Sequence, residues 1–193
     1  MVKSTLTADL VAANRILFSE GVLDGFGHVS VRDERRPDRF WLARSMAAGL
    51  VEARDILAFG LDGEPLDARS RAVFLERFIH SEIYRARPDV QAVVHSHSPN
   101  LVPFGTTPTP LKPLYHMTGF LGEGVSVFEI RKMAGKGTNL LITNGRLGAA
   151  LAKSLGAKPA ALMRGHGSVA VGSSLQQVVY RAIYMELNAR LQA

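Results

Sequence analysis

Two histidines, His95 and His97, end an apolar stretch that begins at Ala92 and is rich in β-branched residues. Such a stretch predicts a buried strand, and side chains two positions apart on a strand point to the same face. The two imidazoles therefore converge, which makes them an efficient chelating pair for a transition metal. Core or solvated histidines produce the same pattern, so the pair needs further ligands before it indicates a metal site.

Two more residues could complete this site. His166 follows a second apolar run, 160–163, and is bracketed by glycines that let the backbone approach a neighbouring group closely. Glu76 lies in a predicted helix that ends shortly before the strand of His95. Three imidazoles and one carboxylate describe a divalent-metal site with room for water or substrate. The sequence contains no cysteine that would compete as a ligand.

Periodicity predicts the elements that must position these residues. Helices are expected at 5–20, 70–86, 146–155 and 174–191, with Thr7 capping the first one. Five residues of the second helix recur at helical spacing and are expected to face the core: Phe74, Leu75, Phe78, Ile79 and Ile83. Strands are expected within 25–32 and at 40–43, 92–98, 125–130 and 160–163, with a tight turn at Asp62-Gly63.

Length and composition limit the class of protein. With 193 residues, 47% of them hydrophobic and 21% charged, the chain fits one soluble domain with its own core. No apolar run approaches the roughly 20 residues that span a bilayer, no secretory pattern begins the chain, and the lack of cysteine fits the cytoplasm. The net charge of +6 is scattered, so we expect a small anionic substrate and neither nucleic acid nor membrane as partner.

Together with their spacing, these residues resemble the class II aldolase/adducin family. The resemblance rests on Glu76, on Arg-Pro-Asp-Val-Gln-Ala-Val-Val-His-Ser-His at 87–97 and on Gly-His-Gly at 165–167. The segment Gly-Phe-Gly-His-Val-Ser-Val-Arg at 25–32 is similar to the Gly-Asn-Val-Ser loop of that family. The likeness extends over about residues 5–190, nearly the whole chain.

The resemblance implies a fold, a ligand set and an assembly. The fold would be a single α/β domain over 1–193, with three α-β-α layers around a central, mostly antiparallel sheet. His95, His97 and His166 would bind one divalent metal per subunit, Mn²⁺ or Zn²⁺ with Fe²⁺ possible, and Glu76 would be the catalytic carboxylate that can also reach the metal. The assembly would be a homotetramer with its active sites between subunits.

The sequence departs from the family members that act on sugar phosphates. Where they use Asn, a Thr-Gly turn and a Ser-Ser pair to hold phosphate, this chain has His28, then Arg44 with Ser45, then Phe74-Leu75. The guanidinium of Arg44 could instead grip a planar carboxylate through two parallel hydrogen bonds. This pattern resembles the aromatic decarboxylase branch of the family, which includes 3-hydroxy-2-methylpyridine-4,5-dicarboxylate decarboxylase.

We therefore expect a metal-dependent carbon–carbon lyase that decarboxylates a hydroxylated pyridine or benzene dicarboxylate, with the metal as electron sink. Arg44 and Ser45 would hold a substrate carboxylate. The candidates for protonating the ring carbon are Glu76 first, then His28, His116 and Tyr184. Three alternatives remain: a class II aldolase for a non-phosphorylated hydroxy-keto substrate, a dehydratase or epimerase, and a non-catalytic adducin-like binding module.

Overall fold

A seven-stranded sheet forms the centre of the computed structural model, which describes residues 2–193 and the side chains from Thr5 onward. The strands are ordered β3-β2-β1-β4-β7-β6-β5, and every neighbouring pair is antiparallel except β5 with β6. Their bounds are β1 His28–Arg32, β2 Arg39–Ala43, β3 Ile56–Gly60, β4 Ala92–Ser96, β5 Ser126–Phe128, β6 Ala160–Met163 and β7 Gly167–Gly172.

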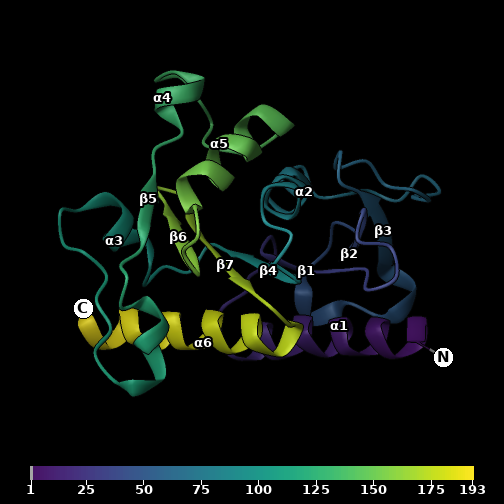
Figure 1. Cartoon of the computed structure of the whole chain (residues 1–193), viewed down its shortest axis with the longest axis horizontal. Coiled ribbons are helices and arrows are strands. Elements are labelled where there is room, and N and C mark those ends of the chain that lie inside the picture. Colours follow the sequence, from purple (N-terminus) through teal and green to yellow (C-terminus); the bar gives the residue numbers. More distant parts are fainter. Residues whose placement is uncertain (1) are drawn as a thin grey trace.

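Helices cover both faces of the sheet (Figure 1). Along one face lie α1 (Val2–Ser19) and α6 (Leu175–Gln192), and on the other α2 (Arg77–Ala86) packs against α5 (Gly145–Leu155). The shorter helices are α3 (Val102–Thr106), α4 (Arg131–Ala134) and the 3-10 turns η1 (Ala48–Leu50), η2 (Ala53–Asp55) and η3 (His116–Leu121). These layers confirm the expected α/β fold with a mostly antiparallel sheet. Among the described helices, none has the length and apolarity needed to cross a membrane.

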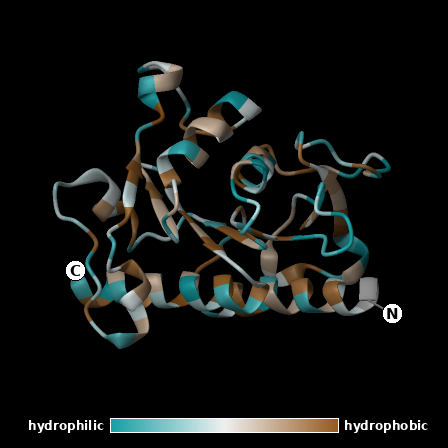
Figure 2. Cartoon of the chain, viewed as in Figure 1, coloured by the Kyte–Doolittle hydropathy of each residue, from teal (hydrophilic) through white to brown (hydrophobic). Residues whose placement is uncertain are grey.

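Each face of the sheet has its own hydrophobic core because strand side chains alternate. In β4, Ala92 and Val94 belong to the core beneath α1 and α6, whereas Val93 belongs to the core beneath α2 and α5. The strands are accordingly hydrophobic along most of their length, while the helices mix hydrophobic and hydrophilic residues (Figure 2). The same alternation places His95 on the face that α2 covers, which is the face that carries Glu76.

The helix before β4 begins later than its periodicity predicts. A helix was expected over 70–86, but α2 starts only after Glu76, which occupies the N-cap position. Arg69 and Ser70 adopt positive φ angles of 45° and 64°, a left-handed backbone that an α-helix of L-residues does not accommodate. The prediction that Leu75 faces the core is therefore wrong, since its side chain is 61% exposed. The other four predicted core residues are buried or half-buried: Phe74, Phe78, Ile79 and Ile83.

The remaining predicted elements agree with the structure to within a few residues, whereas β3 and β7 had no predicted counterpart. The predicted helices at 146–155 and 174–191 correspond to α5 and α6, and Ser174 caps α6 through its side chain. The first helix already begins at Val2, so Thr7 lies inside it and does not cap it. The strand expected at 125–130 is shortened to the three residues of β5. The turn after β3 is present, with Gly63 at a φ of 83°.

Candidate metal centre

Four potential ligands from three distant parts of the chain meet at one point. Glu76 precedes α2, His95 and His97 lie at the end of β4, and His166 lies in the turn between β6 and β7. Their ligand atoms all lie within 4.8 Å of one another. The Nε2 atoms of His95 and His97 are 3.0 Å apart, and Oε2 of Glu76 lies 3.2 Å from Nε2 of His166. The structure thus brings together all four residues that the sequence suggested as ligands.

The turn that carries His166 depends on its two glycines. Gly165 has a φ of 70°, which favours glycine. At Gly167, a β-carbon would collide with the carbonyl oxygen of Ser96, so only a residue without a side chain lets β7 pair this closely with the end of β4. The close pairing places the imidazole of His166 beside that of His95, with ring centroids 5.0 Å apart.

Backbone carbonyls fix the tautomers of two of the imidazoles. Nδ1 of His95 lies 3.0 Å from the carbonyl oxygen of Ser168, and Nδ1 of His166 lies 3.0 Å from that of Leu140. Because a carbonyl oxygen only accepts hydrogen bonds, each Nδ1 carries the proton. In the neutral rings, both Nε2 atoms therefore present lone pairs to the centre of the cluster. Hydrogen bonds of this kind orient imidazole ligands in metalloproteins.

The donor set fits a divalent transition metal. Nε2 of His166 is buried and has no hydrogen-bond partner within the part of the chain that the structure describes. Ligand bonds of about 2.0–2.2 Å in a tetrahedron separate the donor atoms by roughly 3.3–3.6 Å. The distances from Oε2 of Glu76 to Nε2 of His166, His95 and His97 are 3.2, 3.6 and 4.0 Å, which bracket that range. The cluster accordingly could hold such an ion with little rearrangement.

Glu76 is held as a carboxylate by its surroundings. Burial opposes its ionised form, but the His166 and His95 imidazoles outweigh burial and lower the pKa of the Glu76 carboxyl. Its Oε1 atom accepts a hydrogen bond of 2.8 Å from the backbone N–H of Ile142, which leaves Oε2 to face the imidazoles. Burial, and next the neighbouring His95, lower the pKa of His97, which favours its neutral, metal-binding form.

A cavity of about 540 Å³ adjoins the cluster. Its polar lining includes three of the four potential ligands together with two other predicted site residues: Glu76, His97, His166, His28 and Ser45. Its apolar lining comprises mainly Phe26, Val73, Phe74, Leu75, Leu140 and Leu141. A small molecule in this cavity would therefore have polar groups at the cluster and apolar side chains around the rest of its surface.

Arg44 does not line this cavity, unlike its neighbour Ser45. The Nε atom of Arg44 donates a hydrogen bond of 2.7 Å to Oδ1 of Asp55, which is nearly buried. The N–H of Ser45 donates to the carbonyl of Ala72 and so ties the loop before α2 to the end of β2. The predicted pair is thus divided, with Ser45 at the cavity and the Arg44 guanidinium held by an acid.

His116 and Tyr184 both lie near Tyr115, and not at the cluster of their own chain. His116 begins η3 and is exposed, and its ring centroid lies 6.0 Å from that of Tyr115. Tyr184 belongs to α6, with its ring centroid 6.4 Å from that of Tyr115 and 4.7 Å from that of Tyr180. Neither residue lines the cavity beside the four potential ligands.

Asp24 contacts a potential ligand, although no pattern in the sequence predicts this contact. Both of its carboxylate oxygens lie 3.3 Å from Nδ1 of His97. Its Oδ1 also accepts backbone hydrogen bonds of 2.8 Å from Phe26 and 2.7 Å from Gly27. An Asp just before the run Gly25-Phe26-Gly27 is a signal for a turn closed by its own side chain. The contact with His97, 73 residues away, leaves no local signal.

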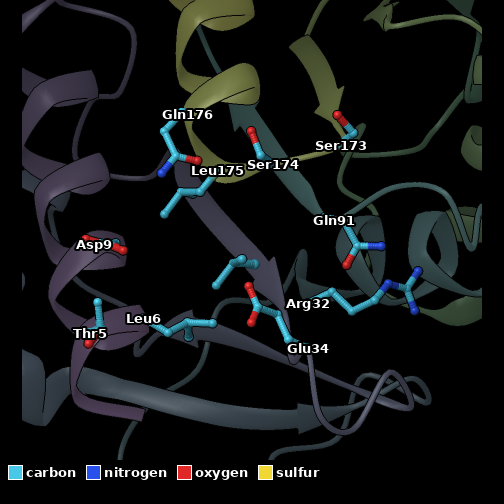
Figure 3. A pocket seen from close by; sticks show the side chains of 11 residues that line it. Thr5, Leu6, Asp9, Arg32, Glu34, Gln91, Ser173, Ser174, Leu175 and Gln176 are labelled. Carbon is cyan, nitrogen blue, oxygen red and sulfur yellow. The ribbon is translucent and has the colours of Figure 1, made fainter. Parts of the chain in front are cut away.

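A second cavity, of about 470 Å³, lies between α1 and the beginning of α6 (Figure 3). Asp9, Glu34 and Arg32 line it, but none of the chain's histidines does. The Arg32 guanidinium is already occupied, since it donates to the backbone carbonyls of Val90, Pro37, Tyr84 and Arg87. The potential for chemistry therefore lies at the cavity of the four ligands.

Comparisons with known proteins agree with this arrangement. A family model described as Class II Aldolase and Adducin N-terminal domain matches residues 8–193. A decarboxylase named tropJ from Talaromyces stipitatus is 42% identical over 194 residues, which cover 94% of this chain and 73% of that protein. A 3,4-dihydroxyphthalate decarboxylase from Arthrobacter keyseri is 30% identical, with 94% and 75% covered. The structure of L-fuculose 1-phosphate aldolase from Glaciozyma antarctica PI12 is similar with a TM-score of 0.81 and 28% identity, covering 98% of this chain and 72% of that one.

Proposed function

Because the chain belongs to the class II aldolase and adducin family, we propose that it is a divalent-metal-dependent decarboxylase of a hydroxylated aromatic dicarboxylate. Its family and its relatives named as decarboxylases place it among the lyases. The observation that carries the proposal is the convergence of three imidazoles and the Glu76 carboxylate at one wall of a largely apolar cavity. A flat ring with acidic substituents matches the chemistry of that lining.

In this proposal His95, His97 and His166 hold one divalent ion per subunit, Mn²⁺ or Zn²⁺ with Fe²⁺ as a further possibility. Such an ion supplies a Lewis acid that withdraws electrons from a substrate oxygen while carbon dioxide leaves. The carbonyls behind two of the imidazoles and the Asp24 carboxylate behind the third keep the ligands in place.

Glu76 is the residue that we propose to move the proton. As a carboxylate it can take the proton of the ring hydroxyl when the substrate binds. It then gives this proton to the ring carbon, which keeps the electron pair of the broken carbon–carbon bond. The oxygen of the product recovers a proton from water, so the reaction consumes one proton for each carbon dioxide released. His28 lies at the same cavity and is the second candidate for this transfer.

Ser45 is proposed to donate a hydrogen bond to the second substrate carboxylate. Arg44, whose Nε–H is held by Asp55, is proposed to join it through the remaining N–H groups of its guanidinium. His116 and Tyr184 are proposed to serve the cavity of a neighbouring subunit in a homotetramer. Phe26 and Leu75, which are 72% and 61% exposed at the cavity rim, support this because a neighbouring subunit would cover them. A cytoplasmic location stays a prediction.

A class II aldolase that cleaves a non-phosphorylated hydroxy-keto substrate is the second candidate. The structural similarity to an L-fuculose 1-phosphate aldolase favours it, since one metal centre can serve both reactions. A non-catalytic adducin-like module is a poorer match, because it has no need of the four converging ligands.

Metal analysis of the purified protein, followed by a substrate screen, tests the proposal. Hydroxylated pyridine and benzene dicarboxylates are offered, and carbon dioxide and aldehyde products are both measured. We expect about one equivalent of divalent metal per chain and carbon dioxide from at least one dicarboxylate. His166→Ala should lose the metal, whereas His116→Ala in the same chain should keep it. Aldehyde without carbon dioxide would favour the aldolase, and a metal-free, fully folded protein would refute both enzymes.

A further inference from the structure

A chain of hydrogen bonds leads from the cavity into the interior of the protein. Nδ1 of His28 lies 2.6 Å from Nε2 of His80, and Nδ1 of His80 lies 2.6 Å from Oγ of Ser30. The Ser30 hydroxyl lies 2.7 Å from the hydroxyl of Tyr84. The exposed fractions of His28, His80, Ser30 and Tyr84 are 1%, 0%, 0% and 1%, so the chain is sealed from solvent except where His28 meets the cavity.

The four residues come from one strand and one helix, and their spacing places each pair on one side of its element. His28 and Ser30 are two positions apart on β1 and share one face, whereas His80 and Tyr84 are four positions apart on α2 and share one side of that helix. The side chains alternate between strand and helix along the chain of hydrogen bonds. Together they fasten α2 to the strand that follows the Asp24 turn.

Every member of this chain can both donate and accept, so the protons can be arranged in two ways. In one arrangement His28 donates through Nδ1 to His80, His80 donates through Nδ1 to Ser30, and Ser30 donates to Tyr84. In the other, Tyr84 donates to Ser30, Ser30 to Nδ1 of His80, and Nε2 of His80 to Nδ1 of His28. The two imidazoles therefore always share one tautomer, because a single proton lies between them.

The inner end of the chain is closed. Burial raises the pKa of Tyr84, so its hydroxyl keeps its proton. The Arg32 guanidinium lies 4.7 Å above the Tyr84 ring and is held there by backbone carbonyls. Burial also lowers the pKa of His80 to about 3, so this imidazole is neutral near neutral pH. The chain therefore does not carry protons to solvent, and its members can only reorient them.

We propose that Ser30, His80 and Tyr84 are positioning residues that present Nε2 of His28 to the substrate as a neutral group able to donate or to accept. Nδ1 of His28 is engaged by His80, which leaves Nε2 as the ring atom that can serve a molecule in the cavity. When Nε2 donates, it can hold a substrate carboxylate. When the carboxylate has left as carbon dioxide, the chain reverses and Nε2 accepts. The role at the substrate rests on the proposed function, but the coupled tautomers do not.

Nitrogen-15 NMR of the histidine rings in the zinc-loaded full chain tests the proposal without a substrate. The signals, assigned from single histidine replacements, report which ring nitrogen carries the proton. In the wild-type protein we expect neutral rings of the same tautomer at His28 and His80. In Tyr84→Phe the Ser30 hydroxyl keeps only His80 as partner and donates to it, so both rings should shift toward the Nε2–H form.

Two further variants complete the test. Ser30→Ala removes the acceptor for Nδ1–H of His80 and should shift both rings in the same direction as Tyr84→Phe. Tyr180→Phe is the matched control, since the Tyr180 hydroxyl donates to the carbonyl of Met117 and should leave both rings unchanged. Opposite tautomers at His28 and His80, or rings that stay in the Nδ1–H form in both chain variants, would overturn the proposal. Coupled tautomers in a protein that releases no carbon dioxide would instead contradict the proposed function alone.

Discussion

Replacement of Asp24 by Asn isolates one contact behind the metal ligands. The carboxylate of Asp24 faces Nδ1 of His97 and also closes the turn at 24–27. In Asp24→Asn the amide oxygen can still accept the hydrogen bonds from Phe26 and Gly27, so the turn is retained. The variant loses the negative charge that orients His97 and makes its Nε2 a stronger donor to a cation.

The geometry sets the expected size of this effect. Loss of a hydrogen-bonding partner behind a metal ligand typically weakens metal binding by about 10- to 100-fold. The contact with His97 is long, at 3.3 Å, and the Asp24 side chain is 52% exposed, so water screens its charge. We therefore expect the lower end of the range, roughly a tenfold higher dissociation constant for zinc, which corresponds to about 1.4 kcal/mol.

Competition between the protein and a chromogenic zinc chelator at pH 7.5 measures this constant. Asp38→Asn is the matched control. Asp38 is 68% exposed, and its contacts with the guanidinium groups of Arg36 and Arg39 are long, at 4.0 Å, so its charge contributes little. Asp24→Ala should bind zinc at least as weakly as Asp24→Asn and should also unfold more easily, since it loses the hydrogen bonds of the turn. Zinc binding by Asp24→Asn within twofold of the wild type would refute the role of this carboxylate.

Three further perturbations have definite expected outcomes. The pKa of His80 is about 3 in the folded protein, against 6.5 when unfolded, so protonation favours the unfolded state. The free energy of unfolding is therefore highest above pH 6.5 and falls progressively below it. Urea unfolding from pH 7.5 to 4.5 should therefore show that, below pH 6.5, the free energy of unfolding falls more steeply in the wild type than in His80→Asn, by about 1.4 kcal/mol per pH unit; equal pH slopes would contradict this. Gly167→Ala should destabilise the protein by about 1–3 kcal/mol because its β-carbon collides with the β4 backbone, whereas Gly25→Ala meets no atom within 4 Å and should unfold like the wild type. Arg44→Ala should lose most decarboxylation, and full activity would show that the arginine serves Asp55 and not the substrate.

The histidine ligands were predictable because each lies in a recognisable pattern of neighbouring residues in the sequence. Alternation along β4 sets the directions of His95 and His97, and the glycines around His166 mark a turn that approaches another strand. Periodicity did not bring His166 to the end of β4, however. The resemblance to a known family supplied that convergence and the mostly antiparallel character of the sheet, and the observed sheet agrees with it.

The features that the sequence did not reveal depend on pairings made only after folding. Arg44 was expected to face a substrate, but Asp55, eleven residues later, binds its guanidinium. Nothing in the neighbouring sequence distinguishes Asp55 from the acids that lie on the surface. Likewise, the apolar spacing before α2 is helical, yet Ser70 takes a left-handed backbone and the N–H of Ser45 pairs with the carbonyl of Ala72. A tertiary contact here overrides helical spacing, as is common for short amphipathic segments.

The segment 24–30 connects metal binding with substrate orientation. Asp24 contacts a potential ligand, His28 lines the cavity, and Ser30 lies in the buried chain that ends at Tyr84. These three side chains share one turn and one strand, and β1 pairs directly with β4, where His28 lies opposite His95. A shift of β1 would therefore displace both the support of His97 and the ring that faces the substrate. The loops 73–75 and 139–141 line the same cavity, and their one contact with an Nδ1 atom of the imidazole ligands is the Leu140 carbonyl at His166. Substitutions in these loops should therefore change substrate specificity more easily than substitutions in 24–30.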